Sequence, residues 1–193
     1  MKEDDNNLNS SGELTDSLKA EILAWCRQIL LARLNHKSPP PAPQALKSLK
    51  GGVFVTLKKF DQLRGCIGRF EFSCPLADSI QEMVLAAGFK DPRFEPLAAS
   101  ELKDLEITIS VLTEPKPLAD IADVVIGRDG LFLLHPHGRG VLLPVVAEEQ
   151  GWSAIEFARH TAVKAGLNPN AWQDPQAQLL VFTAPAFTDK SPN

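Results

Sequence analysis

A single cysteine stands between two glycines and two arginines in the segment LRGCIGR, a pattern that suggests a reactive thiol. Glycine weakens a β-strand, so Gly65 and Gly68 fit best where another group approaches the backbone closely, and both are predicted to bind substrate. A neighbouring cation stabilises a thiolate and promotes nucleophilic chemistry. Side chains alternate along a strand, which puts Arg64, Cys66 and Gly68 on one face. The pattern therefore predicts Arg64 as the partner of Cys66, on a face where Gly68, which has no side chain, leaves space. The alternative is a buried, inert structural cysteine beside a glycine bulge.

The segment FKDPRFEPL is a second candidate for chemistry, because its two prolines predict a rigid, turn-rich loop. Within it, Asp91 and Arg93 are two residues apart. We expect Arg93 to bind an anionic group such as a carboxylate or phosphate, and Asp91 either to orient Arg93 or to act as an acid or base. The alternative is structural, since an aspartate before a proline is ordinary turn chemistry.

A third candidate is the run Gly138-Arg139-Gly140, which is similar to a loop that accepts an anion on free backbone N–H groups. Arg139 and Gly140 are therefore predicted to bind substrate. The nearby pair His135 and His137 has no third ligand at a matching spacing, which favours a surface loop over a metal site. The chain contains no phosphate-binding or dinucleotide-binding glycine motif, so no cofactor is expected.

The elements that would position these residues follow in a mixed order. Apolar residues at helical spacing predict a helix over 17–35, and a proline-rich linker follows it. Residues 51–70 read as a hairpin, and DVVIGRDGLFLLHPHGRGVLLP reads as strand, turn, strand, loop and strand end. Because strands look hairpin-connected and no βαβ alternation dominates, we expect an α+β fold with a mostly antiparallel or mixed sheet flanked by helices. Residues 1–16 and 188–193 are predicted to be disordered tails around one domain at 17–187.

Composition limits the function classes. The chain has 193 residues, 20 basic and 24 acidic, and one lysine and five acidic residues fall within the first 17. The remainder is balanced, which argues against a broad nucleic-acid surface. No stretch approaches the length of a membrane span, and the acidic N-terminus does not resemble a signal peptide. With three cysteines and no C-x-x-C pair, reduced thiols in a cytoplasmic protein are expected.

Several of these segments together resemble the AMMECR1 domain in order and spacing, over about residues 18–187: GVFVTL, LRGCIG, AAGFKDPRFEPL, ELKDLEITISVL and RGVLLPVVAEEQGW. The resemblance implies an antiparallel sheet, a smaller subdomain and shared residues near a cleft, but no established activity. The sequence departs from the family pattern at Val145, where glutamine is usual, and at Ala162, where cysteine is frequent. The positions that match are Arg64, Gly65, Cys66, Ile67, Gly68, Asp91, Pro92, Arg93, Phe94, Arg139, Gly140 and Pro144.

Two functions remain open at this stage. One is a cysteine-dependent enzyme in which Cys66 is the thiolate nucleophile acting on a small anionic substrate. The other is a non-catalytic adaptor that docks a partner through the same cleft. For bacterial proteins of this kind, the resemblance implies membership of the AmmeMemoRadiSam set as its protein A, so the expected partner is a Memo-like or radical-SAM protein.

Overall fold

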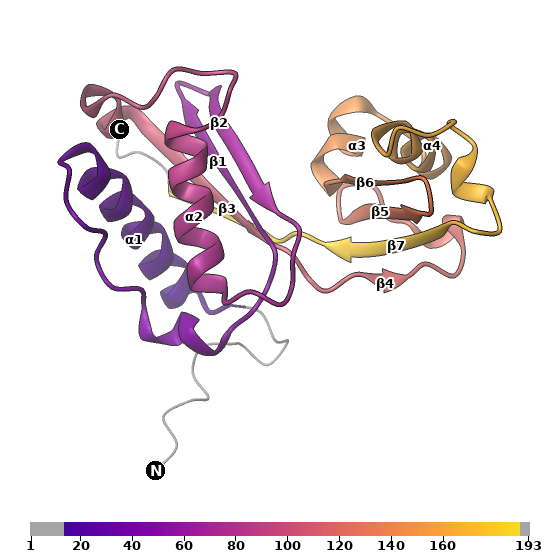
Figure 1. Cartoon of the computed structure of the whole chain (residues 1–193), viewed down its shortest axis with the longest axis horizontal. Helices are drawn as coiled ribbons and strands as arrows, with labels where there is room; N and C mark the ends of the chain where they lie inside the picture. The colour runs from indigo at the N-terminus through magenta and orange to yellow at the C-terminus, as the bar shows by residue number, and fades with distance from the viewer. Residues whose placement is uncertain (1–13, 190–193) are drawn as a thin grey trace, which may run out of the picture. The chain divides into compact units, whose positions relative to one another are not determined.

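The computed structural model describes residues 14–189, which form two compact units (Figure 1). The first unit contains the described residues up to Val111 together with those from Ala186 onward. The second unit is Leu112–Pro185. Each unit combines one antiparallel four-stranded sheet with helices, so the predicted α+β class is confirmed.

The first unit is built on the sheet β2-β1-β3-β8, in which every neighbouring pair of strands is antiparallel. Its strands are β1 (Val53–Lys59), β2 (Gln62–Arg69), β3 (Leu105–Val111) and β8 (Ala186–Asp189). On β1, buried residues alternate with more exposed ones, as the sequence pattern predicts. The turn between β1 and β2 consists of Phe60 and Asp61, both with positive φ, which matches the twist of a two-residue hairpin.

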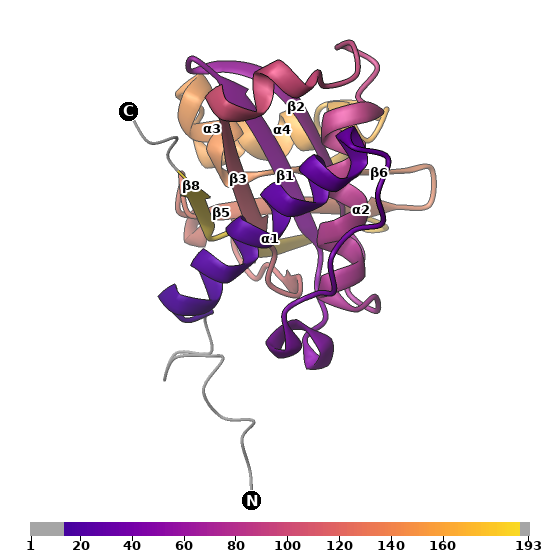
Figure 2. The ribbon, with the colours of Figure 1, turned by 90° about the vertical axis from the view of Figure 1, so that its left-hand side faces the viewer.

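Two helices, α1 (Asp16–Leu34) and α2 (Leu76–Phe89), pack on one face of this sheet (Figure 2). The Thr15 hydroxyl accepts a hydrogen bond from the Leu18 N–H and so caps α1. A strip of apolar residues on α1 is buried against the sheet together with the inner residues of β1 and β3. Cys26 lies on this strip and is fully buried, and burial raises the pKa of its thiol. Short 3₁₀ helices occupy Gln44–Ser48 and Ala99–Asp104.

The second unit is built on the sheet β4-β7-β5-β6. Its strands are β4 (Lys116–Pro117), β5 (Asp129–His135), β6 (Gly138–Leu142) and β7 (Gln178–Thr183). Helices α3 (Pro144–Gln150) and α4 (Ala154–Lys164) cover one face, and 3₁₀ turns lie at Ile121–Asp123 and Ala171–Gln173. Phe157 on α4 is the largest fully buried side chain of this unit's core.

The strand predicted around DVVI does not form. The structure has a 3₁₀ turn at Ile121–Asp123, and β5 begins only at Asp129. The buried Asp129 carboxylate accepts a hydrogen bond from the Val125 N–H at 2.9 Å and pairs with Arg128 at 2.7 Å, and these contacts fold the preceding segment back into a loop. A local side-chain acceptor of this kind competes with strand pairing.

The second unit is inserted into the first between β3 and β8. Ser110 on β3 pairs with Ala186 on β8, so the chain leaves and re-enters the first unit at adjacent positions. Just inside the second unit, hydrogen bonds join Thr113 to Thr183 at the end of β7, including one from the Thr113 N–H to the Thr183 carbonyl at 2.9 Å. The two ends of the inserted unit therefore touch one another.

The predicted tails lie mostly outside the described residues, and the described part of the chain extends slightly beyond the predicted domain at 17–187 at both ends. Thr15 and Asp16 belong to the start of α1, and Leu14 is buried. At the other end Thr188 and Asp189 belong to β8, because they pair with β3. Among the described residues, no helix is both long and apolar enough to cross a membrane.

Candidate functional site

A β-bulge in the first hairpin decides which way Cys66 faces. Leu57 pairs with Gly65 while the next residue, Lys58, pairs with Leu63, so Arg64 is the extra residue of the bulge. Beyond it, Cys66 stands opposite Thr56. These two side chains point to the face of the sheet opposite α1 and α2, which we call the open face, because Leu57 and its partner Gly65 point toward the helices.

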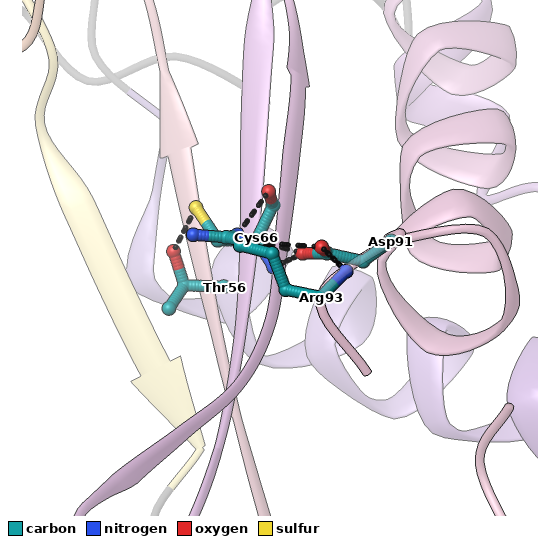
Figure 3. A network of polar contacts seen from close by, with 4 residues as sticks. All are labelled: Thr56, Cys66, Asp91 and Arg93. Atoms are coloured by element: carbon teal, nitrogen blue, oxygen red, sulfur yellow. Dashed lines mark hydrogen bonds and ion pairs between the residues drawn. The ribbon is translucent and has the colours of Figure 1, made fainter. Parts of the chain in front are cut away.

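The Cys66 thiol contacts a hydroxyl. Its Sγ lies 3.3 Å from Oγ1 of Thr56, and both residues are half-buried (Figure 3). The backbone N–H and C=O of Cys66 bond to Asp91 and Arg93 in the loop that flanks β2, and so point away from β1. The pair is thus of the non-hydrogen-bonded type, in which opposite side chains come closest. Backbone geometry therefore brings sulfur and hydroxyl together.

The Asp91 carboxylate fastens the loop of residues 91–94 to the edge of β2. It is buried, and it accepts hydrogen bonds from the Cys66 N–H at 2.9 Å and from the Arg93 N–H at 3.1 Å. It also accepts from Nε and Nη2 of Arg93, at 2.9 and 2.7 Å. These bonds, those from the Arg93 side chain first, hold the pKa of Asp91 well below its usual range despite burial. The arrangement favours the orienting role of Asp91 over an acid or base role.

Arg93 is the cation at Cys66. Besides its bonds to Asp91, Nη2 donates to the Cys66 carbonyl at 3.2 Å, and Figure 3 shows the side chain reaching from the loop to Cys66. Asp91 raises the pKa of Arg93, and the nearby Cys66 sulfur adds to the rise. The side chain is 53% exposed, and within the described residues Nη1 makes no hydrogen bond. Arg93 therefore keeps donors for an incoming anion.

Arg64, predicted as the partner of Cys66, binds elsewhere. Its Nε and Nη2 donate to the two carboxylate oxygens of Glu101, at 3.0 and 2.9 Å. Lys59 adds a third contact to Glu101 at 3.3 Å. Led by the Arg64 hydrogen bonds, these contacts lower the pKa of Glu101 to about 2. Because Arg64 occupies the bulge, it is turned to Glu101, and the prediction is corrected: the cation that contacts Cys66 is Arg93, through the Cys66 carbonyl.

Both glycines beside Cys66 are explained by packing within the first unit. A Cβ at Gly65 would lie 2.1 Å from the Ala87 carbonyl oxygen on α2, so this position lets the helix approach the strand. A Cβ at Gly68 would lie 2.2 Å from the ring of Phe54, its partner on β1. The room predicted over Gly68 is therefore filled by Phe54, and neither glycine requires a ligand.

Arg139 and Gly140, the other predicted substrate-binding residues, belong to the second unit. Arg139 is exposed on β6. Gly140 is buried, and a Cβ there would lie 2.5 Å from the Thr161 carbonyl oxygen on α4. Gly140 thus allows close strand–helix packing, and the predicted anion loop is in fact a β-strand.

His135 ends β5, and His137 lies in the turn before β6. Nδ1 of His135 accepts the His137 N–H at 3.2 Å, and Nε2 lies 3.7 Å from Asp174. Between residues 14 and 189 no group of three or more metal-binding side chains occurs. All three cysteines are free thiols, and Cys66 and Cys74 are half-buried.

Thr56 and Glu101 were missed in the sequence. A hairpin with the turn at Phe60 and Asp61 but no bulge would place Gly65 opposite Thr56, so only the bulge brings Thr56 to the thiol. Glu101 could have been sought as the first-turn acid of a short helix, since its carboxylate also accepts from the Ala98 N–H at 3.0 Å. Nothing in the sequence spacing, however, connects Glu101 with Arg64.

Comparison with known proteins agrees with the fold and with the order of these motifs. The sequence model of the AMMECR1 family matches residues 23–187, and the chain belongs to this family. The chain is 42% identical to a protein of Methanothermobacter thermautotrophicus, over 79% of this chain and 82% of that one. It is likewise 42% identical to a protein of Methanopyrus kandleri, over 74% of this chain and 73% of that one.

A similar solved structure is the crystal structure of an uncharacterised protein from Pyrococcus horikoshii. Its sequence is 31% identical, and the two structures agree with a TM-score of 0.82 over 92% of this chain and 94% of that chain. The architecture of both units is therefore shared with an archaeal relative.

Proposed function

We propose that the protein is a cysteine-dependent enzyme that acts on a small anionic substrate, with Cys66 as the nucleophile. The observation that carries this proposal is the placement of the Arg93 guanidinium, which is fixed by Asp91 against the backbone of the half-buried Cys66. A thiol beside an oriented cation with unused donors offers an anchor for the charge of an anionic substrate. A nearby cation is also the kind of group that stabilises a thiolate.

Each residue has a distinct role in this proposal. Arg93 binds the anionic group of the substrate and stabilises the thiolate, Asp91 positions Arg93, and Thr56 hydrogen-bonds the sulfur. The thiol proton passes to solvent, and a sulfur electron pair forms the bond to an electrophilic carbon. The pair of the broken bond departs with the leaving group. No described histidine contacts Cys66, so water takes the place of a side-chain base.

Competitive alkylation tests this role of Arg93. Iodoacetate and iodoacetamide differ mainly in charge, so the ratio of their reaction rates at Cys66 measures attraction of an anion. We expect Arg93→Gln to lower this ratio by about tenfold to hundredfold, because a charge-assisted contact contributes roughly 1.5–3 kcal/mol. Peptide mass spectrometry would follow Cys66, Cys74 and Cys26 separately in each sample, with Cys74 as the internal reference.

Arg69→Gln is the matched control, since Arg69 lies on the same strand but pairs with Glu82. It should leave the ratio of the two rates at Cys66 unchanged, and in this variant the rates are compared directly and not against Cys74, because Arg69 also acts on Cys74. The proposal fails if Cys66 reacts no faster than the buried Cys26, or if Arg93→Gln and the wild type give the same ratio. If Arg64→Gln lowered the iodoacetate-to-iodoacetamide ratio at Cys66 as much as Arg93→Gln does, the attraction of the anion would have to be assigned to Arg64 as well.

A second candidate, the adaptor, is favoured by a different observation. Packing inside the first unit accounts for Gly65 and Gly68, so the motif needs no substrate to explain it. In this proposal the surface around Cys66 and Arg93 docks a Memo-like or radical-SAM protein. Co-purification from native extract separates the two: a stoichiometric partner that is kept by Cys66→Ala but lost by Arg93→Glu supports the adaptor. Absence of such a partner from wild-type protein counts against it.

A further inference from the structure

The open face carries a line of hydroxyl groups that begins at Cys66. Thr56 pairs with Cys66 on one side and with Thr108 on the other, and Thr108 pairs with Thr188. These pairs are in register, so Thr56, Thr108 and Thr188, which we call the hydroxyl row, cross the sheet from β1 to β8. Adjacent strands are about 4.8 Å apart, so the row extends roughly 14 Å from Cys66.

Continuity with the thiol distinguishes this row from ordinary use of threonine in strands, where its β-branch is favoured. With Cys66 added to the row, each of the four strands contributes a hydroxyl or thiol to the open face. The neighbouring line contains Gly68, Phe54, Ser110 and Ala186, with a single hydroxyl among them.

The row also has free hydrogen-bonding capacity. Oγ1 of Thr108 and Oγ1 of Thr188 lie 2.8 Å apart at an exposed position, and this contact uses only one of their two O–H donors. The second O–H and most of the lone pairs remain for another molecule. Near the thiol, Oγ1 of Thr56 is shared with the sulfur at 3.3 Å.

The geometry points to the hydroxyl row as a substrate subsite for an extended, polyhydroxylated chain. This inference rests on the proposed function and names the substrate class: an anionic group at Arg93, an electrophilic carbon at Cys66, and a hydroxylated chain along Thr108 and Thr188. The chain lies across the strands, because the row itself runs perpendicular to them. Hydroxyl groups of the substrate exchange hydrogen bonds with the row in place of water.

Two alkylating reagents of equal length test the row: N-hexyl iodoacetamide and the iodoacetamide of an amino-hexitol. In both, the sulfur attacks the iodomethylene carbon, iodide leaves with its electron pair, and the thiol proton goes to solvent. At Cys66, relative to Cys74, the hexitol reagent should react about fivefold to tenfold faster than the hexyl reagent, as expected for one or two added hydrogen bonds. Thr108→Val and Thr188→Val, which keep shape and β-branching, should bring this ratio to about one.

Ser110→Ala is the control, since Ser110 lies on the same face but outside the row, and it should keep the wild-type ratio. A wild-type ratio near one, or a preference that survives the combined Thr108→Val and Thr188→Val change, would overturn the row. Either result leaves the iodoacetate test of Arg93 unaffected. If Cys66 reacts with no reagent at all, the proposed function fails and the row fails with it.

Discussion

Asp91 is the residue on which the candidate site depends most. A buried carboxylate that accepts four hydrogen bonds leaves several donors unsatisfied when it is removed, including the Cys66 N–H. At the same time Arg93 loses the two bonds that fix its guanidinium against the strand. Stability and site geometry are therefore linked through a single side chain.

Asp91→Asn should lower the free energy of unfolding by about 2–3 kcal/mol, because the amide cannot accept from all four donors. Urea denaturation measures this as a lower midpoint with an unchanged slope. Glu71→Gln, at an exposed carboxylate that contacts Ser73, is the comparison and should be nearly neutral. An Asp91→Asn midpoint within error of wild type would show that the loop holds without this charge.

The protein should lose stability in acid in a defined pH range. The pKa values of Asp91 and Glu101 are lower in the folded chain than their ordinary values of 3.8 and 4.5. Their stabilisation is therefore complete above about pH 4.5 and is lost as the pH falls toward about 2 for Glu101 and lower for Asp91. We expect a total loss of about 2–4 kcal/mol between pH 5 and pH 2, measured by urea denaturation at each pH.

In this experiment Glu101→Gln should flatten the dependence, because one of the two groups no longer titrates between the folded and unfolded states. A wild-type stability that is constant from pH 5 to pH 2 would mean that neither carboxylate makes the stabilising hydrogen bonds seen in the structure. A variant slope as steep as wild type would assign the loss to other acids.

At this scale the sequence predicted the residue types at the site better than their partners. Cys66, Asp91 and Arg93 were all proposed from local patterns, and the structure brings them together. The predicted partner of Arg64 was wrong because the spacing of residues in the sequence does not reveal a β-bulge. The one extra residue turns Arg64 toward Glu101. The same bulge selects Thr56 as the neighbour of the sulfur.

Among the elements, the contact between β2 and α2 is the tightest one at the site. Gly65 touches the helix backbone, whereas Gly68 touches a side chain that can turn away. Gly65→Ala should therefore cost about 3 kcal/mol of unfolding free energy, and Gly68→Ala about 1 kcal/mol. Equal losses in urea denaturation, or a larger loss for Gly68→Ala, would contradict this account of the glycines.

Elements with a clear period were predictable, and those set by long-range contacts were not. The apolar alternation of Val53, Val55 and Leu57 and of EITISVL correctly predicted β1 and β3. The stretch DVVI has a composition typical of a strand, yet it forms a loop because the Asp129 carboxylate accepts a hydrogen bond from the Val125 N–H. The composition of the stretch does not indicate that contact.

For the whole molecule, the insertion predicts that the first unit can fold alone. Its core is made by its own helices and strands. Removal of the second unit would leave chain ends at Val111 and Ala186, which lie close together in the sheet. Replacing Leu112–Pro185 by a short Asn-Gly loop should leave a protein with a cooperative urea transition and the iodoacetate preference of Cys66. A non-cooperative transition would show that the second unit is needed for the first to fold.

This arrangement was beyond sequence reasoning, because a chain that returns to a sheet after a whole unit leaves no local pattern. The return strand is short, Ala186–Asp189, and gains its place from contacts far away in the chain. Asp189 pairs with Arg27 on α1 at 2.5 Å and accepts the Ile107 N–H at 2.8 Å.

The late position of β8 in the sequence has a consequence for folding during synthesis on the ribosome. Synthesis runs from the N-terminus, so Asp189 emerges only after all of Leu112–Pro185 has been made. Until then Arg27 lacks its carboxylate and β3 remains an uncovered sheet edge, whereas the inserted unit is complete as soon as Pro185 has emerged. The part of the protein that is translated first is thus the last to be completed, and the nascent chain exposes the β3 edge until its final strand arrives.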